Sequence, residues 1–121
     1  MIIAVDFDGT LHTGAYPSIG DMRPGAQEYM QKLKNDGHYI ILNTCRCGDT
    51  LLEAINWCLW QSIPIDRVND NHPELVAKYQ SNSRKISADI YVDDKQIIEL
   101  PSWEEIYKHV LDLTYCDTKF A

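Results

Sequence analysis

The amino-terminal segment constrains the fold of this chain more than any other. Residues 1–7 would present apolar side chains on both faces of an extended strand, with Asp6 as the one exception. A strand that is apolar on both faces is typical of a parallel sheet buried between helical layers. We therefore expect this segment to be the central strand of an α/β domain.

Strand-like and helix-like segments alternate along the rest of the chain. Further strands are expected over 39–44, 65–68, 89–92 and 96–100. Helices are expected over 24–35, over 49–61 with Asp49 as N-cap, from 73 onward, and after the capping-box pattern at Ser102. This order predicts one domain over 1–121, a Rossmann-like three-layer α/β/α sandwich with a doubly wound, mainly parallel sheet. Ligands of such folds bind at the carboxyl ends of the strands, near the point where the strand order reverses.

Composition limits the functions that are open to the chain. Its 121 residues, 45% of them hydrophobic, provide enough apolar material for one core. A formal net charge of −7, with no basic cluster, argues against nucleic acid as a partner. No apolar run reaches the roughly 20 residues that a membrane span needs. The cysteines at 45, 47, 58 and 116 have neither zinc-site nor disulfide-scaffold spacing, so we expect a cytoplasmic protein with reduced thiols and no membrane contact.

Two pairs of carboxylates are expected at one edge of the sheet. Asp6 and Asp8 are two residues apart, so their side chains point to the same side where the first strand ends. Asp93 and Asp94 follow the strand expected over 89–92, and parallel strands bring their carboxyl ends to the same edge. Clustered like charges need a compensating cation, and an all-oxygen ligand set suits Mg²⁺. The sequence therefore predicts a Mg²⁺ site.

Two further residues are candidates for phosphate binding at this edge. Thr44 ends the strand expected over 39–44, which brings a hydroxyl and the following backbone N–H groups to the acidic pairs. Lys85 lies in the segment that leads to the next acidic strand end, and we expect its flexible ammonium to reach back over that end.

In their order and their places at strand ends, these residues resemble the four motifs of the haloacid dehalogenase-like (HAD) phosphohydrolases. The most specific match is Asp6-Phe7-Asp8-Gly9-Thr10 after a hydrophobic first strand, and Thr44, Lys85 and the doublet Asp93-Asp94 follow in order. The resemblance covers nearly the whole chain. It implies a Mg²⁺-dependent phosphatase that hydrolyses a phosphate monoester of a small phosphorylated substrate.

The resemblance also implies a role for each motif residue. Asp6 would be the nucleophile and form an aspartyl-phosphate. Asp8 would act as general acid and then as general base, so it would have to be partly protonated when the substrate arrives. Thr44 and Lys85 would stabilise the phosphoryl oxygens. Because the family's dehalogenases lack the second aspartate, Asp8 favours phosphate hydrolysis over carbon–halogen cleavage.

Metal ligands follow from the same resemblance. Mg²⁺ would be held by the carboxylate of Asp6, by the backbone carbonyl of Asp8, and by Asp93 and Asp94, directly or through water.

The spacing of the motifs leaves no room for a cap domain. Thirty-five residues separate Asp8 from Thr44 and 40 separate Thr44 from Lys85, and each stretch must also hold a helix and a strand of the core. An inserted domain needs roughly 50 residues or more. We therefore expect a capless member, whose open site would depend for selectivity on the loop 12–21, a neighbouring subunit or a large substrate.

Two other functions remain open on the sequence alone. Receiver-type phosphoacceptor modules also combine an acidic cluster, Thr, Lys and Mg²⁺, although their acidic residues come in a different order. The other is a catalytically inactive binding protein on the same fold. The lysine is open as well, because Lys78 is an alternative to Lys85.

Several other residues have two interpretations each. Arg46 either meets a substrate or lies on the surface. His12, on the loop after the first motif, either contacts the substrate or lies on the surface, and we expect the surface position. Trp57 and Trp60 fall on one side of the helix expected over 49–61, so they either form a homo-oligomer interface or are covered by this chain. The predicted inward stripe of that helix lies opposite and consists of Leu51, Ala54, Ile55, Cys58 and Leu59.

Overall fold

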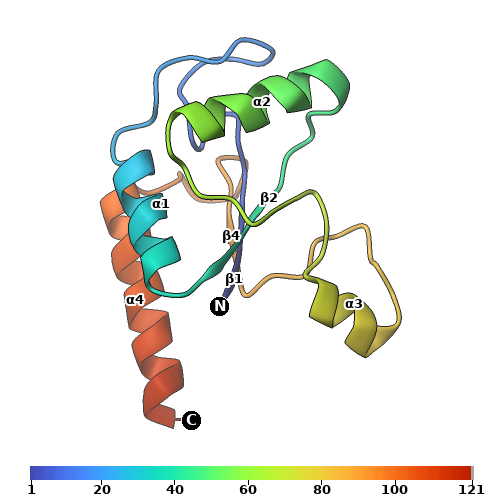
Figure 1. Cartoon of the computed structure of the whole chain (residues 1–121). Coiled ribbons are helices and arrows are strands. Elements are labelled where there is room, and N and C mark those ends of the chain that lie inside the picture. Colours follow the sequence, from blue (N-terminus) through green and yellow to red (C-terminus); the bar gives the residue numbers. More distant parts are fainter. Residues whose placement is uncertain (121) are drawn as a thin grey trace.

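A computed structural model describes the backbone of residues 1–120 and the side chains of residues 1–115 (Figure 1). The strands in this part of the chain are β1 (Ile2–Val5), β2 (Tyr39–Leu42), β3 (Arg67–Val68) and β4 (Ile90–Val92). The helices are α1 (Ala26–Asn35), α2 (Gly48–Trp60), α3 (Pro73–Tyr79) and α4 (Trp103–Phe120). None of these helices combines the length and the apolar character that crossing a membrane requires.

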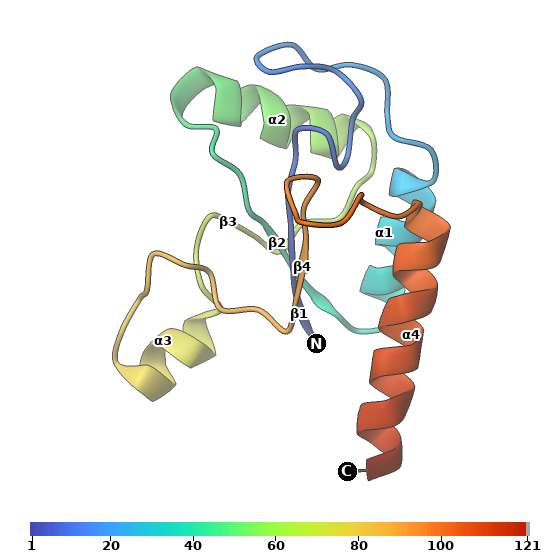
Figure 2. The ribbon, with the colours of Figure 1, turned by 180° about the vertical axis from the view of Figure 1, so that it is seen from behind.

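The strands form one sheet in the order β3-β2-β1-β4. The chain moves outward from β1 to β3 and then returns to the other side of β1, so the strand order reverses between β1 and β4. Right-handed crossovers then put α1 and α2 on one face and α3 on the other, while α4 packs beside α1 (Figures 1 and 2). The predicted Rossmann-like α/β fold is confirmed, with every strand pair parallel and no cap domain among the described residues.

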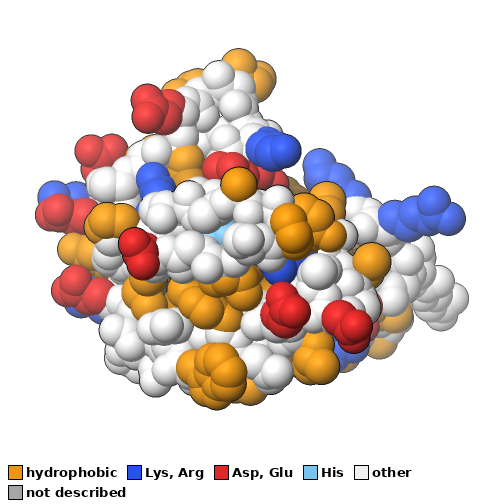
Figure 3. Space-filling model, turned by 90° about the horizontal axis from the view of Figure 1, so that it is seen from above, with side chains coloured by type: hydrophobic (Ala, Val, Ile, Leu, Met, Phe, Trp, Pro, Cys, Tyr) orange, Lys and Arg blue, Asp and Glu red, His pale blue; other side chains and the backbone are white. Residues whose placement is uncertain are grey.

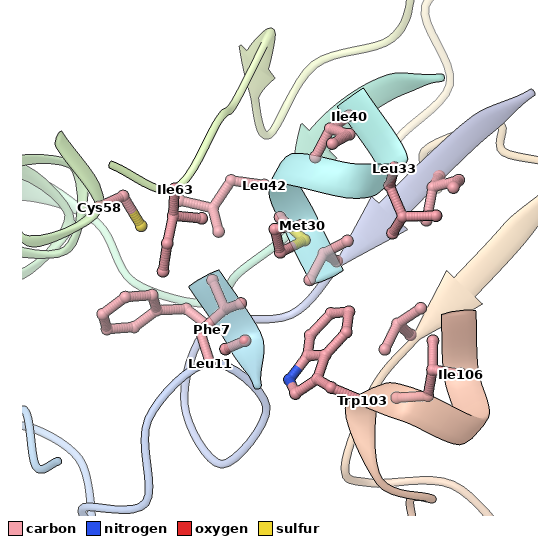
Figure 4. Packing of buried hydrophobic residues seen from close by; sticks show 14 of the residues in the cluster. Phe7, Leu11, Met30, Leu33, Ile40, Leu42, Cys58, Ile63, Trp103 and Ile106 are labelled. Carbon is pink, nitrogen blue, oxygen red and sulfur yellow. The ribbon is translucent and has the colours of Figure 1, made fainter. Parts of the chain in front are cut away.

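The main core lies between the sheet and the helices α1, α2 and α4 (Figure 4). The central strand and its extension contribute Ile3, Val5 and Phe7, all fully buried. Trp103 of α4 is 1% exposed, and its indole N–H donates to the carbonyl oxygen of Thr10 (3.0 Å). A smaller cluster on the opposite face consists of Ala4, Ile41 and Ile86. Each large side chain buried in this way stabilises the fold by about 1.5–3 kcal/mol. Phe7 and the hydrogen bond from Trp103 to Thr10 therefore hold the turn after β1 against the main core.

The prediction of a fifth strand over 96–100 is wrong. β4 ends at Val92, and the chain turns at once because the Asp93 carboxylate accepts the backbone N–H of Lys95 (2.9 Å). Ile97 and Ile98, the apolar pair behind the expectation, are both exposed. No strand in the described part of the chain pairs with them.

The second helix differs from its prediction at its start and on its buried face. α2 begins at Gly48 after Cys47 as N-cap, so Asp49 lies in the first turn instead. Leu59 was predicted to face inward but is 70% exposed, whereas Trp57 is half-buried and meets the Phe7 ring edge-on at 5.5 Å between ring centres. The other four residues of the predicted stripe, Leu51, Ala54, Ile55 and Cys58, are buried or half-buried as expected, so only its edge differs, with Trp57 packed beside Phe7 in place of Leu59.

Candidate functional site

Three carboxylates meet where β1 and β4 end. Asp6 directly follows β1, Asp93 and Asp94 directly follow β4, and the Asp6 backbone N–H donates to the Val92 carbonyl (2.9 Å). One carboxylate oxygen from each of the three lies within 4.8 Å of the other two. We call these residues the acidic triad. It lies at the reversal of strand order, where sites of such folds are found. Viewed from above, this end of the molecule carries acidic, cationic and hydrophobic side chains close together (Figure 3).

The turn after β1 is shaped to fit the triad. Gly9 has a φ of +80°, and a Cβ atom on it would lie 2.2 Å from Oδ2 of Asp94, so a side chain at this position would displace that carboxylate. The Thr10 hydroxyl donates to Oδ2 of Asp6 (3.1 Å) and accepts the backbone N–H of Asp94 (3.1 Å). One threonine thus links the two strand ends and fixes the orientation of the Asp6 carboxylate.

The electrostatics of the triad suit a cation. Burial raises the pKa of Asp6 to about 7, and the neighbouring Asp94 and Asp93 act in the same direction. A divalent cation between the three carboxylates would relieve this repulsion, and carboxylate oxygens are ligands that Mg²⁺ accepts. The residues present therefore fit the predicted metal.

Asp8 lies in different surroundings from the triad. Its Oδ2 accepts from Nε of Arg46 (2.9 Å), and its Oδ1 accepts from Nη2 of Arg46 (2.7 Å) and from Nε2 of His12 (2.8 Å). Burial acts to raise the pKa of Asp8, but the hydrogen bonds from Arg46 and His12 outweigh it and lower the pKa below its usual range. These donors favour the ionised form of Asp8 in the site without substrate, and a partly protonated Asp8 when the substrate arrives stays a prediction.

His12 is fully buried, so its expected surface position is wrong. Its Nδ1 accepts the backbone N–H groups of Gly14 (3.0 Å) and Gly20 (3.1 Å). An Nδ1 that accepts two hydrogen bonds leaves the ring proton on Nε2, which points to Asp8. His12 is therefore a positioning residue that holds Asp8 from the loop side.

Arg46 is also buried, with 2% exposure, so its interpretation as a surface residue is wrong, and the guanidinium that it presents to the cavity is already bonded to Asp8. Besides Asp8, its guanidinium donates to the carbonyl oxygens of Thr50 (3.1 Å) and Pro17 (3.1 Å). The rings of Phe7 and Tyr16 lie 5.0 and 5.1 Å from it. Arg46 thus joins the turn after β1, the loop before α1 and the start of α2.

Thr44 lies where the sequence places it, beyond the carboxyl end of β2. Its backbone N–H donates to Oδ1 of Asn69 (2.8 Å), and its hydroxyl oxygen accepts the backbone N–H of Arg46 (3.1 Å). The hydroxyl hydrogen remains available to a ligand. In the described part of the chain the backbone N–H of Cys45 also has no hydrogen-bond partner. Both donors suit a phosphate oxygen, as predicted.

These groups surround one cavity of about 480 Å³. It is lined by Asp6, Asp8, Tyr16, Thr44, Cys45, Arg46, Asp93, Asp94 and Lys95. The structure therefore brings together all four predicted aspartates and Thr44. Sequence reasoning missed Tyr16 and Lys95, although Lys95 adjoins the acidic doublet and its position was a usable signal.

Lys85 is not brought to this cavity. It precedes β4 and lies at the amino end of that strand, with its ammonium 5.2 Å from the centre of the Tyr91 ring. The alternative, Lys78, belongs to α3 and has its ammonium 5.2 Å from the Tyr79 ring. In Figure 1 both α3 and the segment after it lie toward the end of the sheet opposite the loops that follow β1 and β2.

The cysteines and tryptophans are spread over separate parts of the fold. Cys45, Cys47 and Cys58 are free thiols, and burial raises the pKa of Cys58 to about 12. The side chain of Cys116 lies outside the described residues. Since Trp57 packs on the core and Trp60 is 83% exposed, the two tryptophans do not form a shared exposed face. A homo-oligomer through that face stays a prediction, with Trp60 as its exposed member.

A solved structure of a conserved protein from Bacteroides thetaiotaomicron is similar to this chain. The sequence identity is 38%, the match covers 93% of this chain and 90% of that one, and the TM-score is 0.84. The chain belongs to the same family as this Bacteroides protein. No protein-family model and no curated protein matches it. The likeness to this protein agrees with the α/β fold of the chain.

Proposed function

We propose that the protein is a HAD-like, Mg²⁺-dependent phosphatase that hydrolyses phosphate monoesters through an aspartyl-phosphate on Asp6. The observation that carries the proposal is the acidic triad, with one carboxylate oxygen of each residue within 4.8 Å of the others, in the same cavity as the Thr44 hydroxyl, whose hydrogen is available to a ligand. Four aspartates and a threonine in one cavity match the order and placement of the family's motifs.

Asp6 is suited to the role of nucleophile. Thr10 holds its Oδ2 (3.1 Å), which fixes the plane of the carboxylate before the substrate arrives. In the first step an Asp6 oxygen forms a bond to phosphorus, and the bond from phosphorus to the leaving oxygen breaks with its electron pair on that oxygen. In the second step water attacks phosphorus, the bond to Asp6 breaks, and inorganic phosphate and the free carboxylate result.

The remaining groups bind and move protons. The Thr44 hydroxyl and the Cys45 backbone N–H donate to phosphoryl oxygens. Asp8, ionised between Arg46 and His12, takes the proton of the attacking water in the second step. That proton then resides on Asp8, which can pass it to the leaving oxygen of the next substrate.

Mg²⁺ would be held by Asp6, Asp93 and Asp94 and would supply charge neutralisation at the phosphoryl group. The backbone carbonyl of Asp8 as a further ligand stays a prediction. A small phosphorylated substrate suits the cavity of about 480 Å³.

The test is hydrolysis of p-nitrophenyl phosphate with and without Mg²⁺. We expect multiple turnovers that require Mg²⁺, and a loss of at least about 10³-fold in kcat for Asp6→Asn, because a covalent step cannot start without the carboxylate. Asp112→Asn is the matched control, since Asp112 is exposed on α4 and remote from the cavity in sequence and fold. It should keep the activity of the unmodified chain.

Other outcomes would replace the proposal. A stable phosphoprotein without turnover would identify a receiver-like phosphoacceptor module. No metal-dependent reaction with any phosphomonoester would identify a binding protein on this fold.

A further inference from the structure

We infer that Lys95, and not Lys85, is the lysine that binds the phosphate group in the cavity, an inference that deepens the proposed function and rests on it for the substrate. Lys95, which directly follows the doublet Asp93-Asp94, would bind the phosphate group, a role that the sequence analysis gave to Lys85 before β4.

A phosphate group entering the cavity meets an excess of negative charge. Four carboxylates line the cavity against two cationic side chains. The six residues are Asp6, Asp8, Asp93, Asp94, Arg46 and Lys95. A divalent cation on the acidic triad would offset this excess but would leave the two charges of a phosphate monoester without a side-chain partner. At least one side-chain cation is therefore needed at the phosphate.

Arg46 cannot serve as that cation. Its side chain is 1% exposed, and both Nε and Nη2 are bonded to Asp8. Its Nη1 donates to the Thr50 carbonyl oxygen (3.1 Å). Turning the guanidinium toward a ligand would break the pair with Asp8 and leave a partly buried carboxylate without its partner.

Lys95 has the place and the freedom that the role requires. Its backbone N–H donates to Oδ1 of Asp93 (2.9 Å), so the side chain starts beside the acidic triad. Among residues 1–115 its ammonium has no ion pair and no aromatic ring contact, and it lines the cavity. A lysine ammonium carries three donors on a flexible stem, which suits non-bridging phosphate oxygens of variable position.

Lys85 and Lys78 do not lie beside the acidic triad. Lys85 lies over the ring of Tyr91, on the segment that enters β4 from its amino end, and Lys78 lies over Tyr79 on α3. Neither lines the cavity. To reach it, the Lys85 ammonium would have to pass the length of β4.

Binding of inorganic phosphate in the presence of Mg²⁺ tests this assignment without requiring turnover. The phosphate dependence of the thermal midpoint is measured for the unmodified chain, Lys95→Ala, Lys95→Arg and the matched control Lys85→Ala. We expect Lys95→Ala to raise the Kd for phosphate by about 10- to 100-fold, as the loss of one charge-assisted contact implies. Lys95→Arg should restore most of the affinity, and Lys85→Ala should change it by less than about threefold. Stabilisation by Mg²⁺ alone, which reports folding and the triad, should be retained in all variants.

Three results would overturn the inference: unchanged phosphate affinity in Lys95→Ala, a loss confined to Lys85→Ala, or no phosphate binding by the unmodified chain. Its failure differs from failure of the proposed function. A chain that binds phosphate through Lys95 but never turns over p-nitrophenyl phosphate retains the site and loses the enzyme. A chain that turns over this substrate equally well with and without Lys95 retains the enzyme and loses this assignment.

Discussion

Asp8 and Asp6 are two residues apart, yet their neighbours give them opposite properties. Burial and nearby carboxylates raise the pKa of Asp6 to about 7, whereas Arg46 and His12 outweigh burial and lower the pKa of Asp8. Two carboxylates whose pKa values are moved apart can take separate roles in one reaction. Arg46 and His12 therefore favour the ionised form of Asp8, and the position of its carboxylate depends on these two side chains.

Replacement of Arg46 by lysine tests how far Asp8 depends on this support. Lysine cannot reproduce the two hydrogen bonds that the guanidinium makes to the carboxylate, nor the bonds to Thr50 and Pro17. We expect Arg46→Lys to lower kcat for p-nitrophenyl phosphate by roughly 10- to 100-fold with little change in KM, and to lower the free energy of unfolding by about 1–3 kcal/mol. Arg84→Lys, at an exposed position, is the control. A fall in stability with unchanged kcat would show that Arg46 supports the fold alone.

At the scale of elements, the segments that were correctly predicted carry their information locally. The central strand is apolar on both faces, and α1 ends where Asp36 and Gly37 follow its last turn. The Ser102 cap is present too, because its hydroxyl accepts the backbone N–H of Glu105 (3.2 Å). Acidic residues directly after β1 and β4 meet because neighbouring parallel strands end at the same edge.

The segments that were missed depend on contacts distant in sequence. Trp57 faces the core of the chain because it packs against Phe7, a contact that no pattern within the helix reveals. His12 is buried because Gly14 and Gly20 bring two backbone N–H groups to its ring. Lys95 was overlooked because the chain was expected to continue into a strand after the acidic doublet, where the structure has a turn.

The loop before α1 supplies a prediction at this scale. A Cβ atom on Gly14 would lie 2.5 Å from the backbone nitrogen of Gly20, so alanine would push the two sides of the loop apart. His12 would lose its backbone donors and Asp8 one of its partners. We expect Gly14→Ala to lower kcat about tenfold and the free energy of unfolding by about 1–2 kcal/mol, measured by steady-state kinetics and denaturant unfolding. Ala15→Ser, the exposed neighbour, should change neither, and an unaltered kcat in Gly14→Ala would separate this loop from catalysis.

For the molecule as a whole, the site joins the two halves of the sheet. β1 and β4 are neighbours across the reversal of strand order, and the acidic triad draws one carboxylate from the end of β1 and two from the end of β4. Repulsion between the three carboxylates therefore destabilises the pairing of β1 with β4, and with it the folded chain. A bound cation would reverse that effect and favour the folded chain over the unfolded one by mass action.

The pH dependence of unfolding tests this coupling. The pKa of Asp6 rises from 3.8 to about 7 on folding, so its contribution to stability is fully present below pH 3.8 and is lost as the pH rises to about 7. Without metal, Asp6→Asn should therefore melt at a higher temperature than the unmodified chain at pH 8, and this difference should shrink toward zero near pH 4.

With Mg²⁺ at 100 times its Kd the unmodified chain should gain about 2.7 kcal/mol at pH 8. It should gain less at pH 5, where protons compete for Asp6, and Asp6→Asn should gain little at either pH. Calorimetric melting curves provide the measurement. A difference in melting temperature between the two chains that does not vary with pH would show that ionisation of Asp6 does not destabilise the folded chain.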